Sequence, residues 1–112
     1  MLMALNLTEA EKLALGELIT ALKTNWPHAK CKLFGSKVKG IFDAESDLDL
    51  LIVLPCPVTK EIRRQIVHKV FDINLNYGTN ISALIVSEED WQNSPISLLP
   101  IHAFVEEEGV PL

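Results

Sequence analysis

The fold is decided by residues 33–54, which read Leu33-Phe-Gly-Ser-Lys-Val-Lys-Gly-Ile-Phe-Asp-Ala-Glu-Ser-Asp-Leu-Asp-Leu-Leu-Ile-Val-Leu54. An apolar run ends at a Gly35-Ser36 turn, and a longer apolar run begins after Asp47 and Asp49. Because side chains alternate along a strand, the two aspartates point to the same face. The stretch therefore predicts a strand, a turn, a loop and a buried second strand that carries two carboxylates.

Two amphipathic helices are predicted on either side of this stretch. Residues 8–25 open with Thr8-Glu-Ala-Glu11, which matches a capping box, and their apolar residues recur at helical spacing. Residues 60–76 follow the N-cap Thr59 and stop before a glycine. Both helices offer one apolar face, so we expect them to pack on the sheet.

The remaining segments complete an alternating order of helices and strands. Apolar runs bounded by glycine and proline predict strands, and serine before acidic residues or proline predicts the start of a helix. The predicted strands cover residues 29–34, 47–54 and 80–86, and the other predicted helices are a short one over 36–40, a turn or short helix from Ser87, and a last one over 95–108. This order predicts an α/β (α+β) fold with a small mixed sheet, helices on one face and an open face for a ligand.

Composition indicates one globular domain spanning residues 1–112. Hydrophobic residues make up 48% of the chain and charged residues 22%, which is typical of a soluble protein. The longest uncharged apolar run is too short to cross a membrane, and no signal-peptide pattern opens the sequence. Cys31 and Cys56 lack metal-type spacing, and we expect reduced thiols in a cytoplasmic protein.

The acidic net charge and the position of the basic residues indicate which class of ligand the chain binds. The formal net charge of −5 argues against a general nucleic-acid surface, which usually carries a basic patch. One of the two densest basic groups, which includes Lys37 and Lys39, lies beside the Gly35-Ser36 turn. A small anionic ligand held together with metal ions suits this distribution better than a duplex does.

The central stretch carries residue types that bind phosphate and metal. Asp47 and Asp49 would repel each other in an apolar setting unless a cation such as Mg²⁺ joined them. Gly35 and Ser36 offer backbone N–H groups and a hydroxyl at a helix N-terminus, which is a phosphate-binding arrangement. Taken alone, the aspartates also fit a solvated strand edge, but the apolar run that follows them favours a functional site.

The combination Gly35-Ser36-x-x-x-Gly40 and Ser46-Asp47-x-Asp49 resembles the minimal nucleotidyltransferases of the DNA polymerase β superfamily. The resemblance covers most of the chain, including the first helix, the helix after the prolines and the C-terminal segment. It implies a nucleotidyltransferase-like fold. It also implies transfer of a nucleoside monophosphate from a nucleoside triphosphate to an acceptor hydroxyl.

The resemblance also implies roles for individual residues. Gly35, Ser36 and Lys39 would contact the triphosphate, while Asp47 and Asp49 would be catalytic and hold two Mg²⁺ ions. The family's turn usually carries arginines, and this chain has lysines, which lack the bidentate fork. The family's third carboxylate corresponds to residue 80, which is an asparagine and therefore a weak, neutral metal ligand.

Three classes of function follow. The first is an active, Mg²⁺-dependent enzyme that transfers the nucleoside monophosphate to an acceptor hydroxyl, for which a partner protein is a candidate. The second is a catalytically weakened, nucleotide-binding, antitoxin-like subunit that binds a HEPN-type protein, since stand-alone family members often resemble the smaller half of such a pair. The third is an inert structural dimer, which leaves the signature unexplained. The sequence leaves open the nucleotide base, the acceptor and whether the chain forms a homodimer.

Overall fold

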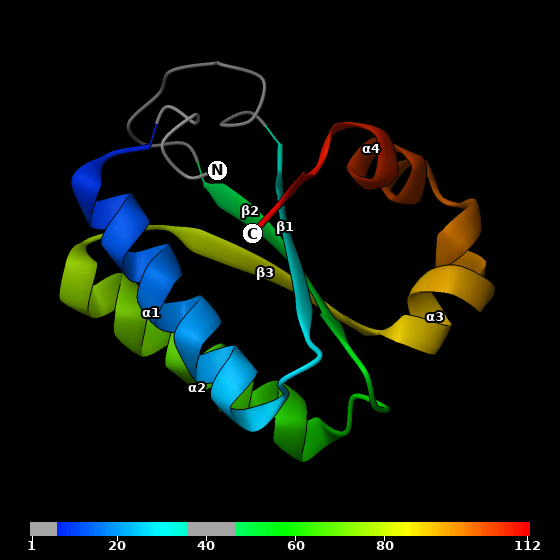
Figure 1. The fold of residues 1–112 in the computed structure, drawn as a ribbon, viewed down its shortest axis with the longest axis horizontal. Helices are drawn as coiled ribbons and strands as arrows, with labels where there is room; N and C mark the ends of the chain where they lie inside the picture. Colours follow the sequence, from blue (N-terminus) through cyan, green and yellow to red (C-terminus); the bar gives the residue numbers. More distant parts are fainter. Residues whose placement is uncertain (1–6, 36–46) are drawn as a thin grey trace.

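The computed structural model describes residues 7–35 and 47–112 (Figure 1). Its four-stranded sheet has the order β3-β2-β1-β4, in which β2 runs antiparallel to β1 and parallel to β3. The predicted mixed α/β architecture is therefore confirmed. The strands are β1 (Lys30–Phe34), β2 (Leu48–Leu54), β3 (Ile81–Ser87) and β4 (Val110–Pro111).

The two predicted long helices are also confirmed, as α1 (Glu9–Asn25) and α2 (Lys60–Tyr77). The capping box forms as expected: the Glu11 N–H donates to Thr8 Oγ1 at 3.1 Å, and the Thr8 N–H donates to Glu11 Oε1 at 2.9 Å. Thr59 caps α2, and the glycine after α2 ends it in a left-handed conformation. Local sequence signals, a threonine cap and a glycine, therefore mark both ends of α2.

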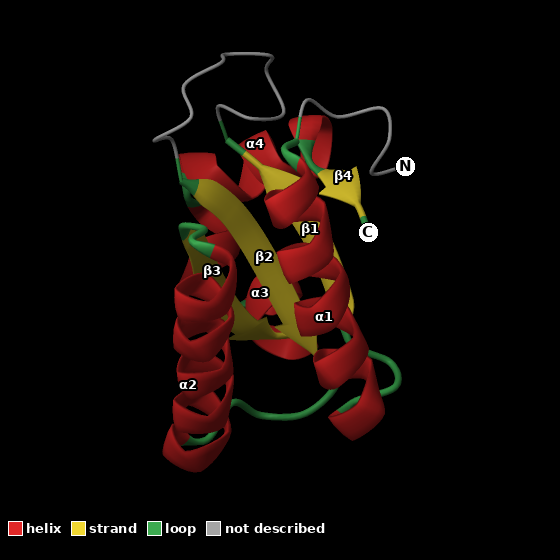
Figure 2. Ribbon diagram, turned by 90° about the vertical axis from the view of Figure 1, so that its left-hand side faces the viewer, coloured by secondary structure: helices red, strands yellow, loops and turns green. Residues whose placement is uncertain are grey.

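The main core lies between the sheet and these two helices. Figure 2 shows α1 and α2 side by side against one face of the sheet. Alternate residues of β2 point into this layer, and the residues between them point to the opposite face. The β2 residues in the main core are Leu48, Leu50, Ile52 and Leu54, and those in a smaller core on the opposite face are Leu51 and Val53.

The prediction that helices lie on one face only is wrong, because helices also cover part of the second face. These are α3 (Glu88–Asn93), the 3-10 helix η2 (Pro95–Leu98) and α4 (Pro100–Glu108). They bury Trp91 and Val105 against the smaller core. The second face is thus open only in part.

The prediction of one continuous helix over 95–108 is wrong. The chain leaves the helical conformation at Leu99, with φ −80° and ψ 148°, and resumes as α4 at Pro100. Proline has no N–H to donate and disfavours helical geometry in the residue before it, so the helix divides there. The short strand β4, which pairs with β1, was not predicted.

Two further points concern the extent of the chain. The short helix predicted over 36–40 and the loop over 41–46 lie outside the described residues. Within residues 7–35 and 47–112, no helix combines the length and apolar character needed to cross a bilayer.

Candidate functional site

Asp49 lies in β2, at the end of the sheet where β1 finishes and β3 starts. The strand register sets it opposite Phe34 of β1 and Ser82 of β3. It belongs to the alternate set of β2 residues that faces the smaller core, and it is partly buried. Asp47 directly precedes β2 and is exposed. Strand alternation thus holds Asp49 on the partly open face, next to the turn that follows β1.

Gly35 packs directly against the Asp49 carboxylate. Its φ of +87° lies in the left-handed region that L side chains rarely adopt. A Cβ atom added at this position would overlap Asp49 Oδ2 and approach Asp49 Cγ to 3.1 Å. The turn therefore requires glycine for two reasons, its backbone conformation and the space that the carboxylate occupies.

The negative charges of Asp47 and Asp49, which lie at this corner of the sheet beside the Gly35 turn, favour binding of a cation. Partial burial, and secondly the negative charge of Asp47, raise the pKa of Asp49 above its ordinary value. A divalent ion near the two carboxylates would offset both effects, and carboxylate oxygens are ligands that Mg²⁺ prefers. The two carboxylates and the closely packed glycine thus fit a metal site. No cluster of three or more His, Cys, Asp or Glu side chains occurs among the described residues.

Asn80 lies at the same end of the sheet, immediately before β3, and is exposed. Its carbonyl oxygen accepts a hydrogen bond from the Leu48 N–H at 2.9 Å. Because Leu48 pairs with Ile81, the parallel register brings Asn80 alongside Asp47. The structure therefore brings together Gly35, Asp47, Asp49 and Asn80 in one region, whereas Ser36 and Lys39 lie outside the described residues.

Ser82 is a candidate that the sequence reasoning missed. It stands opposite Asp49 in the ladder and is exposed. It alternates with the buried Ile81, so its side chain points to the same face as Asp49. The sequence contained one signal, the two-residue spacing from Asn80, but the register that pairs it with Asp49 is a tertiary feature.

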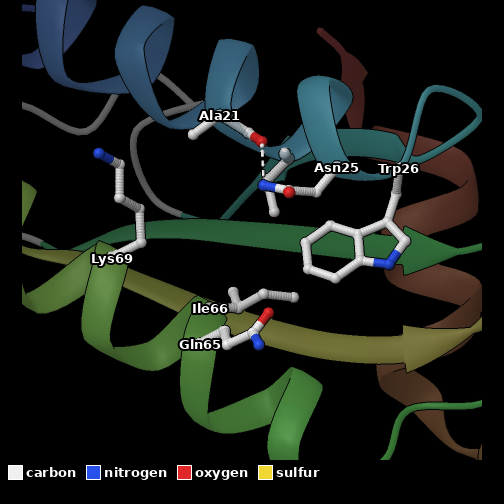
Figure 3. A pocket seen from close by; sticks show the side chains of 7 residues that line it. Ala21, Asn25, Trp26, Gln65, Ile66 and Lys69 are labelled. Carbon is white, nitrogen blue, oxygen red and sulfur yellow. Dashed lines mark hydrogen bonds between the residues drawn. The ribbon is translucent and has the colours of Figure 1, made fainter.

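Two cavities differ in their relation to this corner. One, of about 240 Å³, lies between α1 and α2 and is lined by Trp26 (Figure 3). The Asn25 side chain, which also lines it, donates to the Ala21 carbonyl at 3.1 Å. None of the candidate residues lines it. Another, of about 370 Å³, lies at the end of α2 and includes Asn80 in its wall. The second cavity therefore shares Asn80 with the candidate site, whereas the first shares none of its residues.

A family model described as a nucleotidyltransferase domain matches residues 15–107. The chain belongs to the nucleotidyltransferase domain family. The matched range contains the Gly35 turn, both aspartates and all of β3. No curated protein and no solved structure gave a significant match to the chain. Family membership assigns the chain a general function in nucleotidyl transfer.

Proposed function

We propose that this nucleotidyltransferase domain is a minimal, Mg²⁺-dependent enzyme that transfers a nucleoside monophosphate from a nucleoside triphosphate to an acceptor hydroxyl. The observation that carries the proposal is the contact between the Gly35 turn and Asp49. It joins the two halves of the sequence signature at one corner of the sheet. A phosphate chain bound at the turn would thereby lie next to metal ions bound at the carboxylates.

In this proposal each candidate residue has a defined task. Asp47 and Asp49 hold two Mg²⁺ ions, with Asn80 as a weak third ligand. Gly35, Ser36 and Lys39 bind the triphosphate through backbone N–H groups, a hydroxyl and an ammonium charge. The metal ions supply charge stabilisation for the attacking oxygen and for the pyrophosphate that leaves. The protein contributes mainly positioning, as is usual in phosphoryl transfer.

The neutral amide of Asn80 favours a second candidate function. General-base help is typically worth roughly 10²–10⁴-fold in rate, and an amide is a poor base. A chain that binds the metal–nucleotide complex but turns it over slowly would suit an antitoxin-like subunit of a HEPN-type partner. In that case the partner is also a candidate acceptor. A cytoplasmic location and a homodimer are compatible with both functions.

Calorimetric titration with ATP and Mg²⁺ tests the binding step. We expect wild type to bind and the Asp47→Ala/Asp49→Ala variant to lose most of its affinity. Equal affinities of the two proteins would show that Asp47 and Asp49 do not bind the metal–nucleotide complex.

A second experiment separates the two functions. Wild type and Asn80→Asp are incubated with each labelled nucleoside triphosphate and with the protein encoded by the neighbouring gene. Label transfer by wild type supports the enzyme, whereas transfer by Asn80→Asp alone supports the weakened subunit.

A further inference from the structure

Asn74, near the end of α2, holds the start of β3 through its side-chain amide. Its Nδ2 donates to the Ile81 carbonyl at 3.1 Å, and its Oδ1 accepts from the Ile81 N–H at 2.9 Å. The same Oδ1 accepts from Thr79 Oγ1 at 2.9 Å. The amide thus pairs with Ile81 at both backbone groups, as a neighbouring strand would.

The reason for this pairing lies in the position of β3 at the edge of the sheet. In a parallel ladder, successive residues of a strand direct their backbone groups alternately toward the neighbouring strand and away from it. The Asn80 carbonyl bonds to Leu48 of β2, so the groups of Ile81 point away from β2. The Asn74 side chain bonds to the N–H and the carbonyl of Ile81 on that outer side of β3, where the sheet offers them no neighbouring strand.

The turn between α2 and β3 is fixed by the same residue. The Asn74 backbone carbonyl accepts from the N–H groups of Gly78 and Thr79. Thr79 is only 8% exposed, and its hydroxyl donates to the Asn74 side chain. Side chain and backbone of one residue therefore set the path of the chain over residues 78–81.

We propose that Asn74 is a positioning residue for the metal–nucleotide site, an inference that rests on the proposed function. Asn80 and Ser82 flank the residue that Asn74 holds, and the Asn80 carbonyl is bonded to Leu48, between Asp47 and Asp49. Loss of the amide frees the start of β3, so Asn80 and Ser82 leave their places beside the two carboxylates. Asn74 itself touches neither metal nor nucleotide in this scheme.

The test compares Asn74→Ala with Thr59→Ala, which removes the N-cap at the other end of the same helix. Both variants weaken α2, but only the first releases the turn. We expect the affinity for Mg–ATP to fall about 10- to 100-fold in Asn74→Ala, as is typical when a group that orients metal ligands is lost. Thr59→Ala keeps wild-type affinity. Equal affinities in the two variants would overturn the inference.

A second readout does not depend on nucleotide binding. Amide hydrogen exchange of Leu48 reports whether the start of β3 still lies against β2, and exchange of Ile81 reports its hydrogen bond to the Asn74 side chain. We expect both amides to exchange faster in Asn74→Ala than in Thr59→Ala, and equal rates would contradict the role of the amide. If Asn74→Ala does not fold, Thr79→Val removes one bond to the same Oδ1, and we expect the same changes at smaller size.

The two proposals fail in different ways. If wild type does not bind Mg–ATP, the proposed function and its positioning residue are both wrong, although faster exchange would still show that Asn74 holds the strand. If wild type binds Mg–ATP and Asn74→Ala binds it equally well, only the positioning role is wrong.

Discussion

Gly35→Ala tests the contact at the centre of the site, and Gly78→Ala is its matched control. Both glycines have positive φ, +87° and +67°. A Cβ at Gly78 would meet nothing within 4 Å, whereas a Cβ at Gly35 would overlap the Asp49 carboxylate. Both substitutions therefore strain the backbone, but only Gly35→Ala also brings the new Cβ atom into collision with the Asp49 carboxylate.

The magnitudes follow from these two contributions. A left-handed conformation costs an L residue about 1–2 kcal/mol, which applies to both variants. Moving the Asp49 side chain away from its rotamer adds about 0.5–1.5 kcal/mol in Gly35→Ala alone. At about 4 °C per kcal/mol for a chain of this size, we expect Gly35→Ala to lower Tm by a few degrees more than Gly78→Ala does.

Urea unfolding followed by tryptophan fluorescence measures these costs, and Asp49→Ala supplies the double-mutant cycle. In the Asp49→Ala background, the additional cost at Gly35 should disappear, because the colliding carboxylate is gone. The cost of Gly78→Ala should stay the same. Equal costs for the two glycines, with no coupling between Gly35 and Asp49, would refute the contact. Gly35→Ala should also weaken Mg–ATP binding, because the displaced Asp49 carboxylate is a proposed metal ligand.

Three other variants probe charge. The raised pKa of Asp49 means that its charge opposes folding above that pKa, so Asp49→Asn should raise the free energy of unfolding at pH 7 by up to about 1 kcal/mol after solvent screening. This gain should vanish as the pH falls and wild-type Asp49 takes up its proton; a gain that is constant with pH would contradict the assignment. The hydrogen bond from Trp91 Nε1, at 2.6 Å, is the main cause that lowers the pKa of Glu106. The ionised Glu106 therefore stabilises the fold above the ordinary glutamate pKa, and this stabilisation is lost as the pH falls through the lowered pKa. The free energy of unfolding should therefore fall less steeply with acidification in Glu106→Gln than in wild type, and identical curves would show that the charge of Glu106 adds no stability. Ser82→Asp adds a third carboxylate, opposite Asp49, and should increase the rise in Tm that Mg²⁺ produces. If the rise is the same as in wild type, residue 82 does not lie close enough to the metal ions to bind them.

The sequence by itself determined the elements whose signals are local. The capping box at Thr8, the Thr59 cap and the apolar periodicity of both long helices predicted α1 and α2 almost to the residue. These signals depend only on residues three or four positions apart in the chain, so they can be recognised without knowledge of the tertiary contacts. The division of the last helix at Pro100 was also encoded locally, but the continuous pattern around it concealed the break.

The tertiary structure decided which residues meet. The sequence placed Asp47 and Asp49 on one face of a strand, but the register between strands set Ser82 rather than Asn80 opposite Asp49. It also brought the Gly35 turn against the Asp49 carboxylate and the Asn74 amide against Ile81. Strand register and the packing of a helix on a sheet edge depend on contacts between segments far apart in the chain. Periodicity within a single segment cannot determine those contacts, because it specifies only the face on which a side chain lies.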